Sequence, residues 1–372
     1  MELKCSLIVE PGDGVDHILK AIDGAKQRVE LLVFRFDRDD VEAALIRAVQ
    51  RGVAVQALIA WTNRGGERNL RRLEARLLAA GVTVSRTASD LSRYHGKMMI
   101  VDRKTLFVLA FNFTSLDIEK SRSFGVIARA PRLVGEAVKL FEADCNRHAY
   151  NPAKKTLLVS PVNARPELAE FIRTAEKELL IYDPGVSDPQ MVRLLEDRSR
   201  AGVSVRIIGT LKRASSLVTA FPMAQMRLHV RAIIRDGHDV FIGSQSLRAA
   251  ELDARREIGV IVNDNRALRR MISVFEDDWK LARGEENLKD GKLTGDKIAK
   301  KVAKAIVKEL PPVTEVIQTV ADELPSRKVN LQGLDLDALE ESVRDAVKTV
   351  VKETIQEASI KTDVQIKATV PS

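Results

Sequence analysis

Two segments of the sequence carry side chains suited to nucleophilic and acid–base chemistry. Each has a histidine, a basic residue two positions later and an aspartate five positions after that. Side chains two apart on a strand point to the same face, so each cation is expected beside its imidazole. The residues are His95, Lys97 and Asp102 in the first segment, and His229, Arg231 and Asp236 in the second.

Two imidazoles and two cations that converge suit a phosphodiester substrate. The cations, with Asn112 and Ser246 as further hydrogen-bond donors, would bind the non-bridging oxygens and stabilise charge that grows in the transition state. One imidazole can attack phosphorus while the other protonates the leaving oxygen. Since the cations supply the electrostatic stabilisation, we predict neither a metal ion nor an organic cofactor.

An internal repeat places these residues in register. LFEAD (140–144) matches VFEDD (274–278) at the same offset along the chain that relates the two histidine segments, without gaps from residue 95 onward. A constant offset of this kind indicates a duplicated unit. We therefore expect two halves packed about a pseudo-twofold axis, with both histidines at one site. The repeat pairs His95 with His229, Asp102 with Asp236, and Asn112 with Ser246.

The elements that must position these residues alternate between helix and strand. MMIV and LFVLA are short, β-rich runs bounded by polar residues, which suits buried strands in an α/β layer. The second half repeats the pattern through KELLIYDP (177–184) and RAGVSVRII (200–208). In the first half we predict strands near 29–36, 53–60, 82–86, 96–101 and 105–110, and helices near 14–26, 39–51 and 67–80.

These patterns predict an α/β fold with two repeats, at 1–150 and 151–284, and a helical tail at 285–372. The tail opens on a polar linker, LKDGKLTGDK, and continues into the lysine-rich amphipathic stretch 297–310. Such a face either lies on an anionic membrane or is simply solvated. The apolar seam within 335–357 favours helix–helix pairing, so the tail is also a candidate for self-association.

Composition narrows the expected partners and location. Residues 289–372 hold equal numbers of basic and acidic side chains, so the net charge of +8 belongs to the arginine-rich body. That excess suits an anionic partner such as a phospholipid or nucleic acid. Two distant cysteines and no apolar run of spanning length predict a cytoplasmic protein without a disulfide, at most peripheral to a membrane.

The two segments also carry a family resemblance. HGKMMIVD resembles the H-x-K-x-x-x-x-D motif of the phospholipase D superfamily, and Asn112 falls at the asparagine of its G-S-x-N motif. HVRAIIRD followed by GSQS is similar to the same motifs in degenerate form, with Arg231 for lysine and Ser246 for asparagine. Glu257 matches the downstream acidic residue. The resemblance covers about residues 15 to 283 and ends on a F-x-x-D-W pattern at Phe275, Asp278 and Trp279.

The resemblance implies two phospholipase D-like α/β/α repeats and a cycle through a covalent phosphohistidine. His95 would attack, Glu257 would hold its imidazole, and His229 would act as the acid. The phosphate would be bound by Lys97, Arg231, Asn112, Ser244 and Ser246. Asp102 and Asp236 complete the catalytic motifs, where we expect them to brace the motif loops through ion pairs and hydrogen bonds.

The function predicted from this resemblance is a phosphodiesterase or phosphatidyltransferase with a preference for phospholipid. Departures from the family pattern keep alternatives open. Leu109 and Ala110 replace the expected Gly-Ser, and Ser123 stands where the first half should carry its acidic residue, so His229 is expected to lack an orienting carboxylate. One alternative is a metal-independent nuclease of the same fold. The other is an inactive scaffold whose tail assembles partners.

Overall fold

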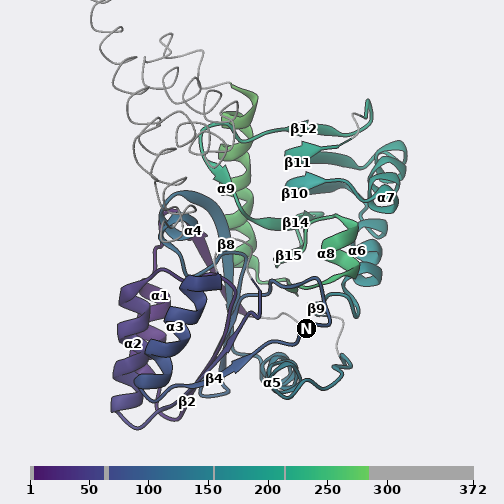
Figure 1. The fold of residues 1–372 in the computed structure, drawn as a ribbon. Helices are drawn as coiled ribbons and strands as arrows, with labels where there is room; N and C mark the ends of the chain where they lie inside the picture. The colour runs from purple at the N-terminus through teal and green to yellow at the C-terminus, as the bar shows by residue number, and fades with distance from the viewer. Residues whose placement is uncertain (1–3, 63–66, 154–155, 213–214, 285–372) are drawn as a thin grey trace, which may run out of the picture. The chain divides into compact units, whose positions relative to one another are not determined.

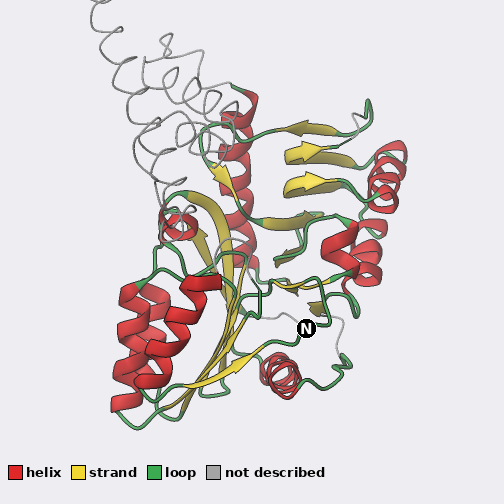
Figure 2. Ribbon diagram, viewed as in Figure 1, coloured by secondary structure: helices red, strands yellow, loops and turns green. Residues whose placement is uncertain are grey.

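The computed structural model describes residues 4–62, 67–153, 156–212 and 215–284, and the predicted tail at 285–372 lies outside them. Residues 1–286 form one compact unit. Within its described part there are two mixed sheets, each with helices on both of its faces, as Figures 1 and 2 show. The predicted α/β fold with two repeats is confirmed.

The first half builds a sheet in the order β1-β8-β7-β6-β2-β3-β4. The neighbours β2, β3 and β4 run parallel, whereas the pairs on the β1 side are antiparallel. All the strands and helices predicted for this half are present. The strands are β1 (Cys5–Glu10), β2 (Arg28–Val33), β3 (Ala54–Ile59), β4 (Thr83–Arg86), β6 (Met98–Val101), β7 (Thr105–Leu109) and β8 (Ser121–Ala128), and the helices are α1 (Asp16–Gly24), α2 (Asp39–Gln50), α3 (Glu67–Ala79), α4 (Ser115–Glu119) and α5 (Pro131–Asn146).

The second half repeats this plan in a sheet ordered β12-β11-β10-β14-β15-β17-β9. It differs in one respect, because the described residues between β11 and β12 contain no helix equivalent to α3. The strands are β9 (Leu157–Val159), β10 (Glu178–Val186), β11 (Ser204–Leu211), β12 (Thr219–Phe221), β14 (Arg231–Arg235), β15 (Asp239–Gly243) and β17 (Ile258–Val262), and the helices are α6 (Ala164–Arg173), α7 (Pro189–Arg200), α8 (Ala249–Asp253) and α9 (Asn265–Arg283).

Three apolar cores separate these layers. One lies between the first sheet and α1–α3, and a second lies between the second sheet and α6–α8. The third and largest joins the two sheets to each other and contains α5 and α9. Strand β6 explains why its sequence, MMIV, does not alternate with polar residues: Met99 faces the helices, while Met98 and Ile100 face the central core.

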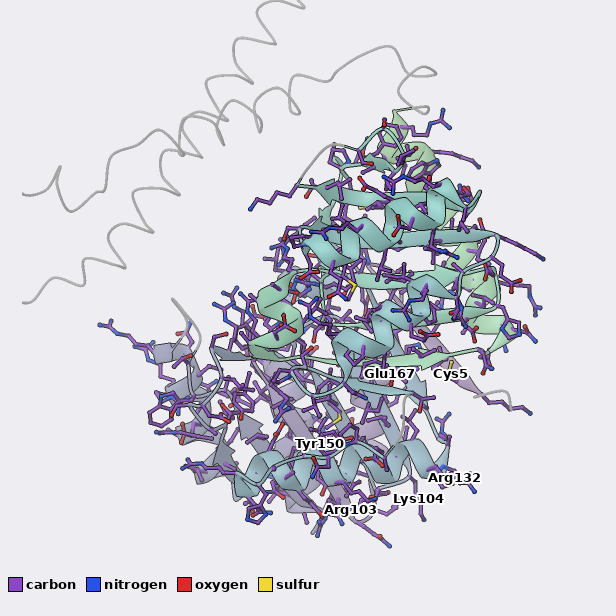
Figure 3. All side chains as sticks on the ribbon, turned by 90° about the vertical axis from the view of Figure 1, so that its right-hand side faces the viewer. Cys5, Arg103, Lys104, Arg132, Tyr150 and Glu167 are labelled. Atoms are coloured by element: carbon purple, nitrogen blue, oxygen red, sulfur yellow. The ribbon has the colours of Figure 1, made fainter. Side chains whose placement is uncertain are left out.

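Helix α5 closes the first half. Tyr150 follows the helix (Figure 3), and its hydroxyl donates a hydrogen bond to Glu136 Oε1 at 3.0 Å, which holds the segment after α5 against the helix. Cys145 near the helix end and Cys5 on β1 are both free thiols, so the prediction that they form no disulfide is confirmed. Among the described helices, none combines the length and the apolar character needed to cross a bilayer.

Two short parallel pairings tie the halves together directly before the histidines. Strand β5 (Arg93–Tyr94) pairs with β16 (Arg255–Arg256) of the second half. In the equivalent place, β13 (Arg227–Leu228) pairs with Ser121 and Arg122 at the start of β8. Each pairing brings one histidine segment against a strand of the opposite half, so the duplicated fold itself brings the two motifs together.

Candidate active site

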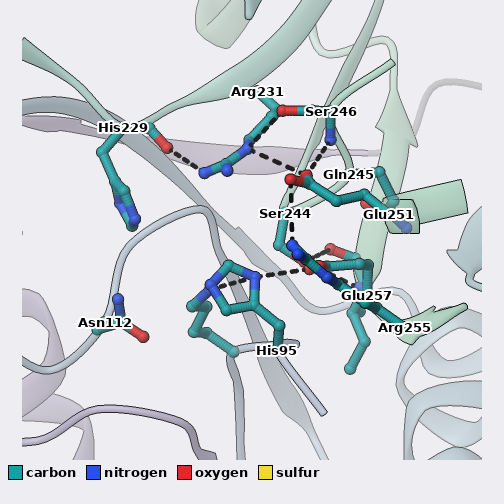
Figure 4. Close-up of polar contacts among 12 residues, drawn as sticks. His95, Asn112, His229, Arg231, Ser244, Gln245, Ser246, Glu251, Arg255 and Glu257 are labelled. Atoms are coloured by element: carbon teal, nitrogen blue, oxygen red, sulfur yellow. Dashed lines mark hydrogen bonds and ion pairs between the residues drawn. The ribbon is translucent and has the colours of Figure 1, made fainter. Parts of the chain in front are cut away.

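His95 and His229 occupy equivalent links at the entrance to their strands. His95 lies between β5 and β6, and His229 lies between β13 and β14. Their backbone N–H groups donate across the seam between the halves, His95 N to Arg256 O at 2.8 Å and His229 N to Arg122 O at 3.1 Å. Figure 4 shows both imidazoles, with Arg231 and Asn112, around a common space.

The imidazole of His95 is oriented by Glu257, which lies between β16 and β17. Its Nδ1 lies 2.9 Å from Glu257 Oε2, and the glutamate side chain is fully buried. Since a carboxylate accepts, Nδ1 carries the proton and donates it, so the lone pair of the ring is on Nε2. Burial, reinforced by the charges of Lys97 and Arg231, holds the pKa of His95 well below its usual value. At neutral pH the ring is therefore uncharged.

Lys97 lies beside that ring, as the spacing of the motif predicts. Its Nζ is 2.9 Å from His95 Nε2, and the side chain has no exposed surface. Burial lowers the pKa of Lys97 to about 7, although the nearby Glu257 opposes the shift. Phe34, which follows β2, packs edge-on against His95 with ring centroids 4.5 Å apart, and Lys97 Nζ lies 5.5 Å from the Phe34 ring centroid. An aromatic face at this distance stabilises the ammonium.

His229 is matched by a different carboxylate, Asp117 at the start of α4. The His229 Nδ1 lies 3.3 Å from Asp117 Oδ2, close enough for an ion pair but not aligned as a hydrogen bond. Asp117 Oδ2 also accepts from Asn112, from its backbone N at 2.8 Å and from Nδ2 at 2.6 Å. Burial raises the pKa of Asp117, but His229, the Asn112 N–H and Arg227 outweigh it, so the pKa of this carboxyl is lowered overall.

Among the described residues, His229 Nδ1 therefore has no carboxylate hydrogen-bonded to it, but a negative charge lies beside it. Ser123 does stand where Glu257 stands in the other half, but Asp117 supplies the negative charge from a neighbouring element. The sequence held a signal for it, since the internal repeat pairs Asp117 with Glu251 and both are acidic. Burial lowers the pKa of His229 well below its usual value, and Asp117 is the strongest charge acting against that shift.

The second half contributes Arg231, the cation of its motif, and Ser246 to the site. Arg231 Nε donates to Ser246 Oγ at 3.1 Å, and Nη1 donates to the His229 carbonyl at 2.8 Å. Glu251 accepts from the Ser246 backbone N at 2.7 Å and lies 3.7 Å from Arg231 Nε. These contacts, drawn in Figure 4, fix the plane of the guanidinium before any anion binds.

Asn112, the predicted counterpart of Ser246, is buried and only partly satisfied. Its Nδ2 is engaged by Asp117, while its Oδ1 has no hydrogen-bond partner among the described residues. An unpaired polar atom at 3% exposure is costly unless a ligand or water binds it. The amide is therefore placed to respond to an incoming group that carries a proton.

Three predicted site residues lie elsewhere or serve another purpose. Ser244 Oγ accepts from Ile258 N at 3.1 Å, so it joins β15 to β17. Asp102 and Asp236 lie at the far ends of β6 and β14 from the histidines, in turns with φ of 52° and 55°. This placement agrees with their expected role as braces of the motif loops and keeps both carboxylates away from the histidines. Asp102 accepts from the backbone N–H groups of Lys26, Gln27 and Arg28, and Asp236 from those of Glu176, Lys177 and Glu178.

The two aspartates thus brace the strands that carry the site rather than the reacting atoms. Three backbone N–H groups converge on each carboxylate at the start of β2 or β10. These hydrogen bonds lower the pKa of Asp102 and of Asp236 despite partial burial, which keeps both ionised. Within the described ranges, no cluster of three His, Cys, Asp or Glu side chains is placed to hold a metal ion.

Two solved structures share this fold. Polyphosphate kinase from Porphyromonas gingivalis superimposes with a TM-score of 0.63 and 20% identity, over 74% of this chain and 50% of that chain. Phosphatidylserine synthase from Haemophilus influenzae Rd KW20 gives a TM-score of 0.59 and 11% identity, over 76% of this chain and 88% of that chain. At these identities the likeness concerns the fold alone.

Curated relatives match by sequence as well. Polyphosphate kinase of Helicobacter pylori is 20% identical over 312 residues, 76% of this chain and 46% of that protein. Polyphosphate kinase of Parasynechococcus marenigrum is 25% identical over 277 residues, 67% of this chain and 38% of that protein. This chain therefore spans less than half the length of either relative.

A family model described as "Cardiolipin synthase, PLD-like domain", where PLD denotes phospholipase D, matches residues 18–145 and 168–279. The two matched ranges correspond to the two halves, and each contains one histidine motif. Together they cover more than half of the chain, so this protein belongs to the phospholipase D-like family.

Proposed function

We propose that this protein is a phospholipase D-like phosphodiesterase or phosphatidyltransferase that acts on phospholipid through a covalent phosphohistidine at His95. The observation that carries the proposal is the buried pair of His95 and Glu257, with Nδ1 and Oε2 2.9 Å apart. The pair lies beside Lys97 and across from His229 (Figure 4). A neutral imidazole with an anchored Nδ1 is what nucleophilic attack by Nε2 requires.

In the first half-reaction, His95 Nε2 attacks phosphorus and the bond to the leaving alcohol oxygen breaks. Lys97 must first move from Nε2 to a non-bridging oxygen of the substrate, which an anionic ester favours by charge attraction. Arg231 would bind the second oxygen through its oriented guanidinium. His229 gives its proton to the leaving oxygen, because the anionic ester and Asp117 together raise its pKa once substrate is bound.

In the second half-reaction, water or an alcohol attacks the phosphohistidine and releases His95. His229 takes the proton of the attacking oxygen, so the ring regains the protonated form that it has in the substrate complex. Glu257 keeps the Nδ1 proton in place throughout, since it is fully buried and cannot be solvated away from the ring. The match to a family model described by cardiolipin synthase supports phospholipid as the substrate and an alcohol as a possible acceptor.

A second candidate is phosphoryl transfer to or from a phosphoanhydride. The sequence matches to two polyphosphate kinases favour it. The same residues would serve, because a phosphoanhydride presents the same anionic oxygens to the cations and the same phosphorus to His95. The two candidates differ in the leaving group, which is an alcohol in a phospholipid and a phosphate in polyphosphate.

A substrate panel tests the proposal. Purified protein is incubated with phosphatidylglycerol vesicles, single-stranded DNA in EDTA, or polyphosphate with ADP, in parallel with His95→Ala. Headgroup release or exchange by the wild type, but not by His95→Ala, would support the proposal. Turnover of DNA or polyphosphate alone would select the nuclease or the phosphoanhydride candidate. A protein that forms no phosphohistidine with any of them would be the inactive scaffold.

With bis(p-nitrophenyl) phosphate, whose leaving group needs no proton from His229, the pH dependence of kcat/KM is expected to follow Lys97. Its charge is present below its pKa of about 7 and is lost above it, so anion binding by the free enzyme weakens as the pH rises. We expect kcat/KM to fall about tenfold per pH unit above this point. Lys97→Arg keeps the charge and should move the falling limb to much higher pH, even if its bulk lowers the plateau. A limb that stays near pH 7 in this variant assigns it to another group.

Asp117→Asn is expected to weaken His229 as an acid. The variant removes the charge that raises the pKa of His229, and we expect kcat to fall about 10²-fold with an alkyl leaving group. With bis(p-nitrophenyl) phosphate the rate of phosphoenzyme formation, measured in a single turnover, should fall by less than about fivefold, because nitrophenolate leaves without a proton. Equal losses for both substrates would mean that Asp117 acts on the fold rather than on His229.

A further inference from the structure

Two buried ion pairs join the halves at symmetry-related places outside the reacting centre. Arg122 donates to Asp278 through Nε at 2.7 Å and Nη2 at 2.9 Å. Arg256 Nη2 lies 3.0 Å from Asp144 Oδ1. The two arginines are equivalent positions of the internal repeat, and so are the two aspartates. Both carboxylates are at most 4% exposed, so neither pair is a surface contact.

Each of these arginines also holds a histidine motif by its backbone. The carbonyl oxygen of Arg256 accepts from His95 N at 2.8 Å and from Gly96 N at 2.9 Å. In the other half, the carbonyl oxygen of Arg122 accepts from His229 N and from Val230 N, both at 3.1 Å. In each half, the carbonyl of one arginine thus holds the backbone N–H groups of the histidine and of the residue that follows it.

On the Arg256 side, the imidazole ring is held as well as the backbone. Glu257, the residue after Arg256, holds His95 Nδ1 at 2.9 Å. A shift of Arg256 would therefore move the backbone anchor and the ring anchor of the nucleophile together. Gly96 shows how closely the segment is fitted, since a Cβ there would lie 2.7 Å from Ile258 Cδ1 and 2.8 Å from Cγ1.

Each guanidinium also donates to a backbone carbonyl at or directly after the first strand of a half. Arg122 Nη1 donates to Glu10 O at 3.0 Å, at the end of β1. Arg256 Nη1 donates to Ser160 O at 3.2 Å, directly after β9. The carboxylate of Asp278 is further fixed by Tyr182, whose hydroxyl donates to Oδ2 at 2.7 Å. Each guanidinium is therefore held by both a carboxylate and a backbone carbonyl.

We propose that Asp144 and Asp278 are positioning residues of the active site, Asp144 for His95 through Arg256 and Asp278 for His229 through Arg122. Their kinetic consequences rest on the proposed function, whereas their effect on the imidazoles does not. Each aspartate lies on the last helix of one half and clamps an arginine of the other. The arginine in turn clamps a histidine of the half that supplied the aspartate.

The test compares Asp144→Asn with Asp278→Asn by ¹⁵N NMR of histidine-labelled protein without substrate. Loss of signals in His95→Ala and His229→Ala assigns the two rings. We expect a crossed pattern, in which Asp144→Asn changes the Nδ1 and Nε2 shifts and the tautomer of His95 only, and Asp278→Asn changes those of His229 only. Rings that respond to neither variant, or to both equally, would overturn the proposal.

Single-turnover kinetics with bis(p-nitrophenyl) phosphate gives a second readout. This leaving group needs no acid, so formation of the phosphoenzyme depends on His95, and its hydrolysis depends on His229 as base. Asp144→Asn should slow formation by about 10- to 100-fold, and Asp278→Asn should slow hydrolysis by a similar factor. If the wild type forms no phosphoenzyme but the NMR pattern is crossed, the proposed function fails and the positioning role stands.

Two further variants separate positioning from stability. Glu42→Gln removes a buried carboxylate that accepts from Arg76 Nε and Nη2, both at 2.7 Å, in the outer helix layer. It should lower the melting temperature and leave both rings and both rates unchanged. If Asp144→Asn does not fold, Asp144→Leu with Arg256→Met restores an apolar pair without the clamp. This double variant should show the same His95 shifts, and unchanged shifts would contradict the proposal.

Discussion

His95→Ala is expected to abolish phosphoenzyme formation and to lower kcat by about 10⁴-fold or more. The variant removes the nucleophilic Nε2, and no other described imidazole has an orienting carboxylate that is fully buried. Trapping with a phosphodiester, followed by mass spectrometry, should find the modification on residue 95 in the wild type. The loss should appear in kcat and kcat/KM alike, since the covalent step is removed.

A matched control is available in the same chain. His238 lies in the turn between β14 and β15, and its side chain is 73% exposed. His238→Ala should keep kcat within about twofold, because substitutions at exposed positions have small effects. Turnover by His95→Ala within tenfold of the wild type, or a phosphoryl group trapped on another residue, would contradict the assignment of the nucleophile.

Glu257→Gln is expected to lower kcat by about 10³- to 10⁴-fold with little change in fold. The amide offers an N–H to His95 Nδ1, which favours the tautomer that has its proton on Nε2. That tautomer has no lone pair at the attacking nitrogen. The loss should fall on the rate of phosphoenzyme formation, measured in a single turnover. The ¹⁵N shifts of His95 should report the exchanged tautomer directly.

Glu10→Gln provides the control for Glu257→Gln. Glu10 is equally buried, and burial raises the pKa of its carboxyl to about 7. Its side chain accepts from Gly14 N through Oε2 and contacts neither active-site imidazole among the described hydrogen bonds and ion pairs, while its backbone carbonyl, which accepts from Arg122, is kept in the variant. A neutral amide can keep that acceptor, so kcat should stay within about threefold. Similar losses in both variants would show that kcat responds to any change at a buried carboxylate.

The sequence was sufficient for the fold and for the pairing of the histidines. The constant offset of the internal repeat identifies His95 and His229 as equivalents, and equivalents in a closed two-repeat fold must face each other or face apart. The apolar runs place both at the start of a strand. Residue types and spacing therefore predict the features that the two repeats share.

Asp117 was missed because its contact breaks that symmetry. Glu257, directly before β17, contacts Nδ1 of His95, whereas Asp117, in α4, lies near Nδ1 of His229. Only the three-dimensional structure shows that carboxylates from two different elements lie beside the same ring nitrogen. The same limit applies to Asp144 and Asp278. Their equivalence was visible in LFEAD and VFEDD, but their arginine partners lie far along the chain in the opposite half.

Ser123 illustrates what covalent linkage of the two repeats makes available. Two identical copies of the first half, arranged as a symmetric dimer, would offer His95 a serine hydroxyl in place of the Glu257 carboxylate. Because the copies are joined in one polypeptide, each can specialise without imposing its substitutions on the other. Here the first copy supplies the imidazole of His95 and the second supplies the carboxylate that orients it, an arrangement that a symmetric homodimer of the first copy could not form.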